Sequence, residues 1–280
     1  MALLKRPDCD VYHELAGNGP PVLLIQGVGV TGEGWRPQVN GLVNNFHTLI
    51  FDNRGIGRSI PCRGPVSIEA MAADARGLMD AAGWESAHVA GHSMGGVIAQ
   101  QLALDASKRV RSLSLLCTFP RGKDAARLTP WVLWMTLRTR LGPRWRRQRA
   151  FLEMLFPREE LQRADLDSLA AQVAALIGRD LAHSPPILLK QVRALGRHDV
   201  SARLSELAGI PTLVLSAEQD PIAPPHYGRR LAELIPGARF EEVADASHGI
   251  TIQRADLINA TLKSFLGTAQ RQFLEKPGAT

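Results

Sequence analysis

The sequence has few cysteines and no long apolar run. Its 280 residues include only Cys9, Cys62 and Cys117, which are scattered and lack a CxxC spacing. Such a set fits neither a disulfide framework nor a zinc site, so we expect no metal and a reducing, cytoplasmic location. No apolar stretch approaches the roughly 18 residues of a spanning helix, so we expect no membrane insertion. The first residues also lack the apolar stretch of a signal peptide.

The chain has fewer acidic than basic residues: 27 Asp and Glu stand against 33 Lys and Arg, which gives a net charge of +6. Part of the excess falls in one segment that contains six arginines and no acid. A solvated helix face is the leading interpretation, with an anionic-substrate funnel or a membrane or partner contact as alternatives. No recognition motif accompanies the segment, so we expect no nucleic-acid partner. The six are Arg138, Arg140, Arg144, Arg146, Arg147 and Arg149.

Short apolar runs alternate with helical patterns through the first 118 residues. This alternation predicts βαβ crossovers and an α/β fold, with a mostly parallel central sheet flanked by helices. Residues 10–15 are expected to form a hairpin with residues 22–25. The expected strands are 22–25, 48–51, 87–90 and 113–116, and the expected helices are 35–44, 67–82 and 95–106.

The pattern changes at about residue 119, where strand-like runs stop and helical patterns take over. We therefore expect a helical insertion over residues 119–205, between two parts of one core, residues 1–118 and 206–280. The α/β alternation resumes in the second part, and the tail after Gly267 is expected to fray. The second part should contain strands at 211–215 and 238–243 and helices at 227–234 and 252–266.

The motif Gly91-His92-Ser93-Met94-Gly95-Gly96 has the form Gly-x-Ser-x-Gly. It lies between a predicted strand and a predicted helix, which is the context in which such a serine stands on a tight turn as a nucleophile. Small residues two before and two after the serine avoid a clash there. The alternative is a purely structural glycine turn. We predict that Ser93 is the nucleophile.

A serine nucleophile needs a base and a group that orients the base. Among eight histidines, His248 is the best base, because it follows the last predicted strand in a loop. The orienting acid is predicted to be Asp220, which follows the strand at 211–215, with Glu218 and Asp245 as rivals. His92, next to the nucleophile, is interpreted as a packing residue.

The reaction also needs donors for the developing oxyanion. We expect the backbone N–H groups of Val28 and Met94 to supply them, because Gly27 and Gly29 let that loop approach a substrate closely. Three of the five tryptophans fall in the helical insertion. Two of them, Trp131 and Trp134, are assigned to the substrate pocket, where they would favour an acyl chain or ring. Ordinary packing within the insertion is the alternative.

These motifs together resemble the α/β-hydrolase fold family, in its serine-nucleophile branch. The resemblance rests on the chain order Ser93, Asp220, His248, on the glycine-rich elbow, and on the segment Asp52-Asn53-Arg54-Gly55-Ile56-Gly57-Arg58-Ser59. It covers roughly residues 10–266, and the helical insertion corresponds to the family's cap (lid). One departure is Gln26-Gly27, where many relatives have His-Gly.

The resemblance implies a serine hydrolase that cleaves a small-molecule carboxylic ester or lactone through an acyl-enzyme, without a cofactor. The chain is similar to bacterial esterases, enol-lactonases and carbon–carbon bond hydrolases. The alternatives are C–C bond hydrolysis or cofactor-free perhydrolysis on the same triad, or a non-catalytic ligand-binding relative. A serine rather than an aspartate at the elbow argues against dehalogenase and epoxide-hydrolase chemistry.

Overall fold

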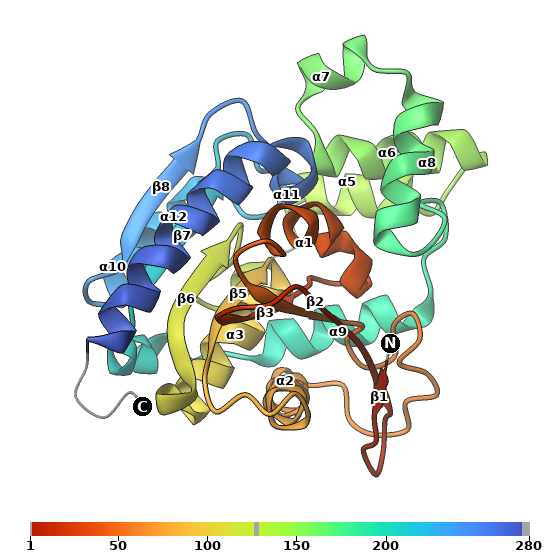
Figure 1. The fold of residues 1–280 in the computed structure, drawn as a ribbon. Helices are drawn as coiled ribbons and strands as arrows, with labels where there is room; N and C mark the ends of the chain where they lie inside the picture. The colour runs from red at the N-terminus through yellow and green to blue at the C-terminus, as the bar shows by residue number, and fades with distance from the viewer. Residues whose placement is uncertain (1, 126–128, 276–280) are drawn as a thin grey trace.

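The computed structural model describes residues 2–125 and 129–275, and one eight-stranded sheet runs through them in the order β1-β2-β4-β3-β5-β6-β7-β8. The strands β4, β3, β5, β6, β7 and β8 run parallel to one another, whereas β2 pairs with β4, and β1 with β2, in the antiparallel sense (Figure 1). This confirms the mostly parallel sheet. The strands are β1 (Ala2–Leu4), β2 (Val11–Ala16), β3 (Pro21–Ile25), β4 (His47–Phe51), β5 (Ala87–His92), β6 (Val110–Leu116), β7 (Thr212–Ala217) and β8 (Arg239–Val243).

The expected hairpin between residues 10–15 and 22–25 is wrong. β2 pairs with β4 instead, with Glu14 opposite Ile50, and both edges of β3 are occupied by the parallel strands β4 and β5. The reason lies in the side chains: β3 is apolar and almost wholly buried, which suits the centre of a parallel sheet. β2 carries polar residues and is partly exposed, so it lies nearer the edge.

Helices flank the sheet, as expected. In α2 the hydroxyl of Ser67 accepts a hydrogen bond from the Ala70 amide, so Ser67 is the predicted N-cap. The last helix is longer than expected: residues beyond Gly267 remain helical because Ala269 is buried and Gln270 contacts His88. The flanking elements are η1 (Gly32–Trp35), α1 (Arg36–Leu42), α2 (Ile68–Ala81), α3 (Met94–Asp105), η2 (Ser107–Arg109), α10 (Pro225–Leu234), α11 (Ile250–Gln253) and α12 (Ala255–Leu274).

Between β6 and β7 the described residues form helices and no strand. α5 to α8 stand above one end of the sheet (Figure 1), and α6, α7 and α8 enclose a small apolar cluster of their own that includes Leu152 and Val173. Leu195 and Leu204, by contrast, belong to the core of the sheet. The elements are α4 (Gly122–Ala125), α5 (Pro130–Arg138), α6 (Arg144–Leu155), α7 (Arg158–Arg163), α8 (Leu166–Ile177), α9 (Pro186–Arg197) and η3 (Ser201–Leu207).

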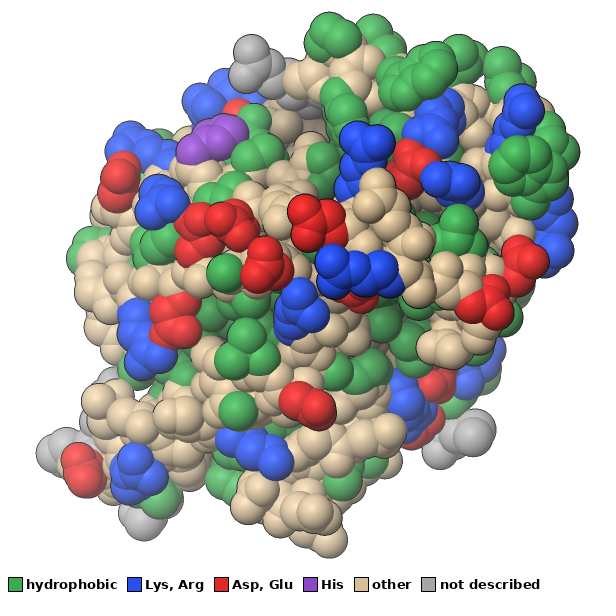
Figure 2. All heavy atoms as spheres, turned by 90° about the horizontal axis from the view of Figure 1, so that it is seen from above, with side chains coloured by type: hydrophobic (Ala, Val, Ile, Leu, Met, Phe, Trp, Pro, Cys, Tyr) green, Lys and Arg blue, Asp and Glu red, His purple; other side chains and the backbone are tan. Residues whose placement is uncertain are grey.

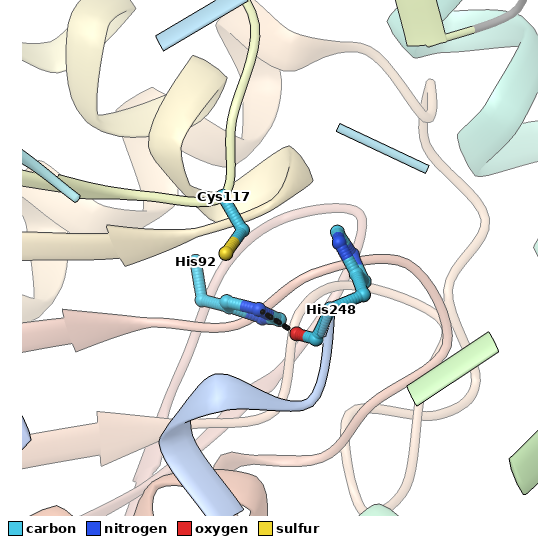
Figure 3. Close-up of side chains that lie close together, drawn as sticks. All are labelled: His92, Cys117 and His248. Atoms are coloured by element: carbon cyan, nitrogen blue, oxygen red, sulfur yellow. Dashed lines mark hydrogen bonds between the residues drawn. The ribbon is translucent and has the colours of Figure 1, made fainter. Parts of the chain in front are cut away.

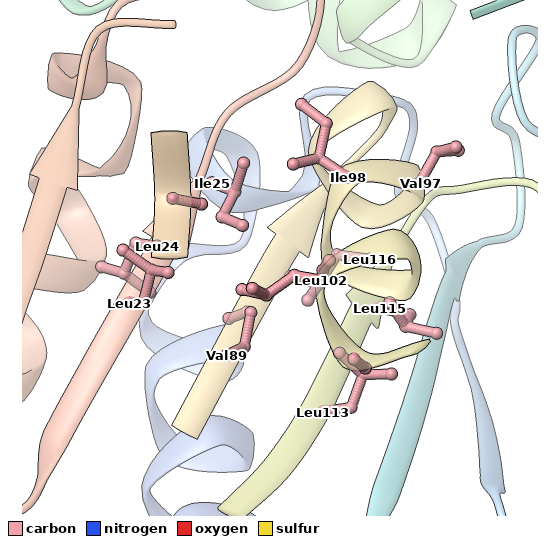
Figure 4. Packing of buried hydrophobic residues seen from close by; sticks show 14 of the residues in the cluster. Leu23, Leu24, Ile25, Val89, Val97, Ile98, Leu102, Leu113, Leu115 and Leu116 are labelled. Atoms are coloured by element: carbon pink, nitrogen blue, oxygen red, sulfur yellow. The ribbon is translucent and has the colours of Figure 1, made fainter. Parts of the chain in front are cut away.

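The main core lies between the central strands and the helices on the two faces of the sheet. Figure 4 shows Ile98 and Leu102 of α3, one helical turn apart, beside the side chains of β3, β5 and β6. Burying one side chain of this size contributes about 1.5–3 kcal/mol relative to leaving it in water. None of the helices in the described ranges combines the length and the hydropathy that a membrane-spanning segment needs.

The segment from Asp52 to Ser59 joins several elements through buried polar groups. The Arg54 guanidinium, 2% exposed, donates to both carboxylate oxygens of Asp74 on α2, at 2.6 and 2.8 Å. Asp52 accepts hydrogen bonds from the amides of Gly32 and Arg58. Because buried charges are tolerated only when they are paired, these contacts hold the loops after β3 and β4 in fixed positions.

A buried histidine gives this fold a pH dependence. The His88 ring of β5 lies between the Ser112 hydroxyl (2.8 Å) and the Gln270 side-chain oxygen (3.0 Å). Burial, helped by the Arg111 charge and opposed by the Gln270 contact, lowers the pKa of His88 to about 4. The unfolded chain therefore takes up this proton at higher pH than the folded one. Stability should fall as pH drops from the ordinary value of 6.5 towards 4.

We predict that His88→Gln removes a difference of about one bound proton between the unfolded and the folded chain. Between pH 6.5 and 4 the free energy of unfolding of the variant should change less steeply than that of wild type, by about 1.4 kcal/mol per pH unit. Urea unfolding at several pH values measures both slopes. Because the test compares only the two slopes, a general loss of stability in the variant does not affect its outcome. Equal slopes would contradict the buried neutral state of His88.

Candidate active site

Ser93 stands on a strained turn between β5 and α3. Its backbone has φ 56° and ψ −122°, a region that residues other than glycine rarely adopt. The glycines around it are required for space: a Cβ on Gly91 would lie 2.2 Å from the Gly95 carbonyl oxygen, and one on Gly95 would lie 2.0 Å from that of Ile25. The turn therefore has the geometry expected of the Gly-x-Ser-x-Gly motif.

The structure brings Ser93, His248 and Asp220 together. The Ser93 hydroxyl oxygen is 3.0 Å from His248 Nε2, and His248 Nδ1 is 2.7 Å from Asp220 Oδ2. His248 comes from the loop after β8, and Asp220 from the loop after β7. Since the carboxyl ends of parallel strands share one edge of the sheet, the three loops meet above β5 to β8.

Asp220 is buried, at 3% exposure, and is held in its charged form. Burial opposes the charge, but His248 and the amides of Ala223 and Ile222, both 2.8 Å from Oδ1, outweigh it and hold the pKa of Asp220 below its ordinary value. The rival acids lie elsewhere: the Glu218 carboxylate accepts from the Asp245 amide, and both side chains are exposed.

The loop expected to hold the oxyanion lies against Ser93. A Cβ on Gly27 would be 3.0 Å from Ser93 Cβ. The amides of Gly27 and Gly29 donate to the side-chain oxygens of Gln26 and Gln191, whereas no described residue accepts from the Val28 N–H. Met94 begins α3, so its N–H has no intrahelical acceptor. Two N–H groups thus remain available beside Ser93.

The Gln26 side chain is turned back onto its own loop, where Oε1 accepts from the Gly27 amide at 3.1 Å. The main-chain carbonyl of Gln26 accepts from the Asn53 side chain at 2.9 Å. Gln26 therefore acts on the shape of the loop through both its side chain and its main chain.

His92, Cys117 and His248 lie close enough together to be considered as a metal site (Figure 3). Their polar atoms have other partners, however. His92 Nε2 contacts the His248 carbonyl oxygen at 2.9 Å, and both nitrogens of His248 are engaged with Ser93 and Asp220. Burial raises the pKa of the Cys117 thiol well above its usual value, so it stays protonated. The donor set fits a hydrogen-bonded cluster better than a metal centre.

His92 has the packing role expected of it. Its ring is buried edge-on against Trp35, and burial lowers its pKa to about 3, with the neighbouring His248 adding to the effect. A neutral imidazole there can donate its Nε2–H to the main-chain carbonyl of His248 and so fix the position of that loop.

A cavity of about 320 Å³ opens on Ser93 and His248. Its wall is mostly apolar and comes from the loop after β3, from α6, α8 and α9, and from the start of α11. Among its apolar lining residues are Phe151, Met154 and Leu155 of α6. Further apolar lining residues are Phe119, Ile177, Leu188, Val192, Leu195, Ile222 and Ile252.

Trp131 and Trp134 do not line this cavity, which corrects their assignment. They lie one helical turn apart along α5 and line a separate groove with Met135 and Arg138, and Trp134 is 58% exposed. The opposite side of the helix and the turn after it supply Thr136, Thr139 and Arg140 to the cavity. The assignment was wrong because the sequence alone does not say which side of α5 faces Ser93.

Most of the basic segment is anchored on the outer side of the helices, and a view from above shows basic and hydrophobic side chains interspersed there (Figure 2). Arg140 is the member that reaches the cavity. The others make contacts within the helical segment: Arg138 and Arg149 with Glu153, Arg144 with Asp180, Arg147 with the Ala182 carbonyl, and Arg146 with the Trp145 ring.

Sequence reasoning missed Arg179, a half-buried cation on the cavity wall just after α8. It stands alone in the sequence, without a motif. The one local signal is Gly178, whose φ of +82° ends the helix and directs the next residue inward.

Comparison with known proteins gives a consistent result. The family model described as alpha/beta hydrolase fold matches residues 20–255. A protein of Azorhizobium caulinodans provisionally named carbamate hydrolase RutD is 34% identical over 267 residues, covering 93% of this chain and 96% of the relative.

Solved structures agree. The enol-lactonase from Burkholderia xenovorans superposes with a TM-score of 0.77 at 29% identity, covering 92% of this chain and 97% of that one. A hydrolase from Pseudomonas aeruginosa gives 0.79 at 27% identity, covering 95% and 98%. The family match over residues 20–255 includes the loops that carry Ser93, Asp220 and His248. The chain therefore belongs to the α/β-hydrolase fold family and is a hydrolase of that type.

Proposed function

We propose that this hydrolase is a serine enzyme that cleaves a small-molecule carboxylic ester or lactone through an acyl-enzyme. The observation that carries the proposal is the hydrogen-bonded chain from Ser93 through His248 to Asp220, at the wall of an apolar cavity. A serine hydroxyl is a weak nucleophile, and an imidazole held by a buried carboxylate is the arrangement that activates it.

In the first half of the reaction, Ser93 Oγ attacks the carbonyl carbon while His248 Nε2 takes the hydroxyl proton. Asp220 accepts the Nδ1–H bond and stabilises the imidazolium. The N–H groups of Val28 and Met94 donate to the oxyanion. His248 then gives its proton to the leaving oxygen, the carbon–oxygen bond breaks, and the acyl group stays on Ser93. In a lactone the leaving oxygen remains attached to that acyl group.

In the second half, a water molecule replaces the leaving group. His248 takes a proton from the water, the resulting hydroxide attacks the acyl carbon, and the same two N–H groups hold the second oxyanion. The carbon–oxygen bond to Ser93 breaks, Ser93 recovers its proton from His248, and the carboxylic acid is released.

We also propose that residues 119–205 act as a cap that selects the substrate, over a core formed by residues 1–118 and 206–280. The support is that α6, α7 and α8 have a separate apolar cluster, while Phe151, Met154 and Leu155 of α6 face the cavity. A wall of this kind favours an acyl chain or a small ring.

Carbamate hydrolysis is the second candidate, because the relative from A. caulinodans carries that name. Ser93 would attack the carbamate carbonyl in the same way and form a carbamoyl-enzyme. The nitrogen lone pair makes that carbonyl a weaker electrophile, so the carbamoyl-enzyme should lose its group to water more slowly than an acyl-enzyme does.

We predict that Ser93→Ala lowers kcat/KM on 4-nitrophenyl butyrate by at least about 10⁴-fold, because the nucleophile is removed. Labelling by a fluorophosphonate probe should be lost as well. The control is Ser107→Ala, an exposed serine in η2, which should keep both activities. Full activity or full labelling of the Ser93→Ala protein would refute the assignment.

The choice of acid is tested by Asp220→Asn. This variant should lower kcat on the same ester by roughly 10³- to 10⁴-fold, because the amide cannot stabilise the imidazolium. Glu218→Gln and Asp245→Asn make the same change at the rival acids and should keep at least half of the wild-type rate. A loss at either rival as large as that at Asp220 would point to a different acid.

The two candidate reactions are separated by substrates that share one leaving group. With 4-nitrophenyl butyrate we expect steady turnover. With a 4-nitrophenyl carbamate we expect a burst of one equivalent of nitrophenol and then slow release. Stopped-flow absorbance records both phases. Steady turnover of the carbamate at a rate equal to or above that of the ester would favour carbamate hydrolysis as the reaction of this enzyme.

A further inference from the structure

The charged lining of the Ser93 cavity is of one sign. Arg140 and Arg179 line it, and no Asp or Glu does so among the residues that the structure describes. Asp220 lies behind His248 and is not part of the wall. Arg140 is exposed, whereas Arg179 is half-buried. A site built only for a neutral acyl chain has no use for a cation in its wall, so Arg179 calls for a specific explanation.

Arg179 is held by backbone carbonyls. Its Nε donates to the Gly29 carbonyl at 3.3 Å, and one terminal nitrogen, Nη1, donates to the carbonyls of His183 (2.6 Å) and Asp180 (3.3 Å). The guanidinium also lies over the Phe151 ring, 5.4 Å from its centre. These contacts use three of its five N–H groups and fix the plane of the guanidinium.

The second terminal nitrogen, Nη2, has no hydrogen-bond acceptor among the described residues. It lies 3.4 Å from where a Cβ on Gly29 would be, and that same position is 2.1 Å from Leu188, which lines the cavity. The Leu188 side chain therefore fills the space beside Gly29, next to Nη2. Since Arg179 lines the cavity and Nη2 is its one nitrogen without an acceptor among the described residues, the two N–H groups of Nη2 are the ones available to a ligand.

No acid among the described residues forms an ion pair with Arg179. Asp180, the next residue, is engaged by Arg144 at 2.7 Å and by Gln148 at 3.1 Å. Burial lowers the pKa of Arg179 from its usual value, against the attraction of Asp180, and a guanidinium remains protonated despite such a shift. A partly desolvated cation without an ion-pair partner favours binding of an anion.

We propose that the substrate of this site carries a carboxylate, which Nη2 of Arg179 binds while Ser93 attacks the ester or lactone carbonyl. This inference rests on the proposed function and specifies its substrate class. Arg179 acts as a specificity-determining residue and takes no part in the chemistry. Arg140, at the exposed part of the wall, attracts the same anion towards the cavity.

The loop from Gly27 to Gly29 sets the length of the substrate. Gly27 lies against Ser93, and Gly29 lies against the guanidinium of Arg179. Two residues span at most about 7 Å, so the carboxylate and the reacting carbonyl should be separated by a short chain of a few carbon atoms. Half-esters of succinate, glutarate and adipate have this form.

The experiment compares two esters that differ only in charge. One is the 4-nitrophenyl half-ester of glutarate, and the other has the terminal carboxylate replaced by a neutral amide. Wild type should favour the charged ester in kcat/KM by roughly 10- to 100-fold, the usual range for one charge-assisted hydrogen bond. Arg179→Gln should bring the ratio close to one, and Arg179→Lys should recover part of it.

The matched control is Arg146→Gln, which removes the same charge from the outer side of α6, where Arg146 stacks on Trp145. It should keep the wild-type ratio. Using the ratio of the two esters cancels a general loss of activity or of folded protein. A wild-type ratio near one, or a ratio that Arg179→Gln leaves unchanged, overturns the inference.

A binding measurement separates this failure from failure of the proposed function. Calorimetric titration of glutarate into the Ser93→Ala protein, with and without Arg179→Gln, measures binding at the proposed carboxylate site in the absence of turnover. Weaker binding after loss of Arg179 supports the carboxylate site even if neither ester is cleaved and the fluorophosphonate does not label Ser93. Equal binding by the two proteins counts against it.

Discussion

The backbone of Ser93, held at positive φ between β5 and α3, is the constraint on which the rest of the site depends. Such a conformation costs of order 1–3 kcal/mol and persists only where its surroundings hold it. Here the Ser93 amide donates to the Leu116 carbonyl at 2.9 Å, and the Thr118 hydroxyl donates to the Ser93 carbonyl at 2.6 Å. Both contacts come from the end of β6, so the neighbouring strand fixes the turn.

The strand on the other side completes the arrangement. Gly95 packs so closely on the end of β3 that no side chain fits, and the loop that follows β3 then lies over Ser93. That loop is held from two directions, by Asn53 through the Gln26 carbonyl and by Gln191 of α9 through the Gly29 amide. The same short loop is therefore tied to the sheet at one end and to the helices above it at the other. The proposed nucleophile and the proposed cap therefore share this connection.

The sequence predicts correctly those features that depend on residues close together in the chain. The elbow was predictable because the glycines that it requires lie within four residues of Ser93, and His248 and Asp220 were predictable because each follows a strand. The pairing of β2 was not, because the Gly17–Gly19 turn suggests a hairpin while strand order depends on contacts distant in sequence. The placement of Trp131 and Trp134 failed for a related reason: helical periodicity groups residues on one face but does not orient that face.

Arg179 shows why composition does not reveal a charge on the wall of a cavity. The basic excess of the chain directs attention to residues 138–149, where most of the arginines find carboxylates, carbonyls or an aromatic ring on the outer side of the helices. Arg179 follows the C-terminal end of α8, where the carbonyl groups of the last turn favour a positive charge. Three backbone carbonyls then accept its N–H bonds. These peptide carbonyls offset part of the cost of burying the cation, and its Nη2 remains available to an anion inside the cavity.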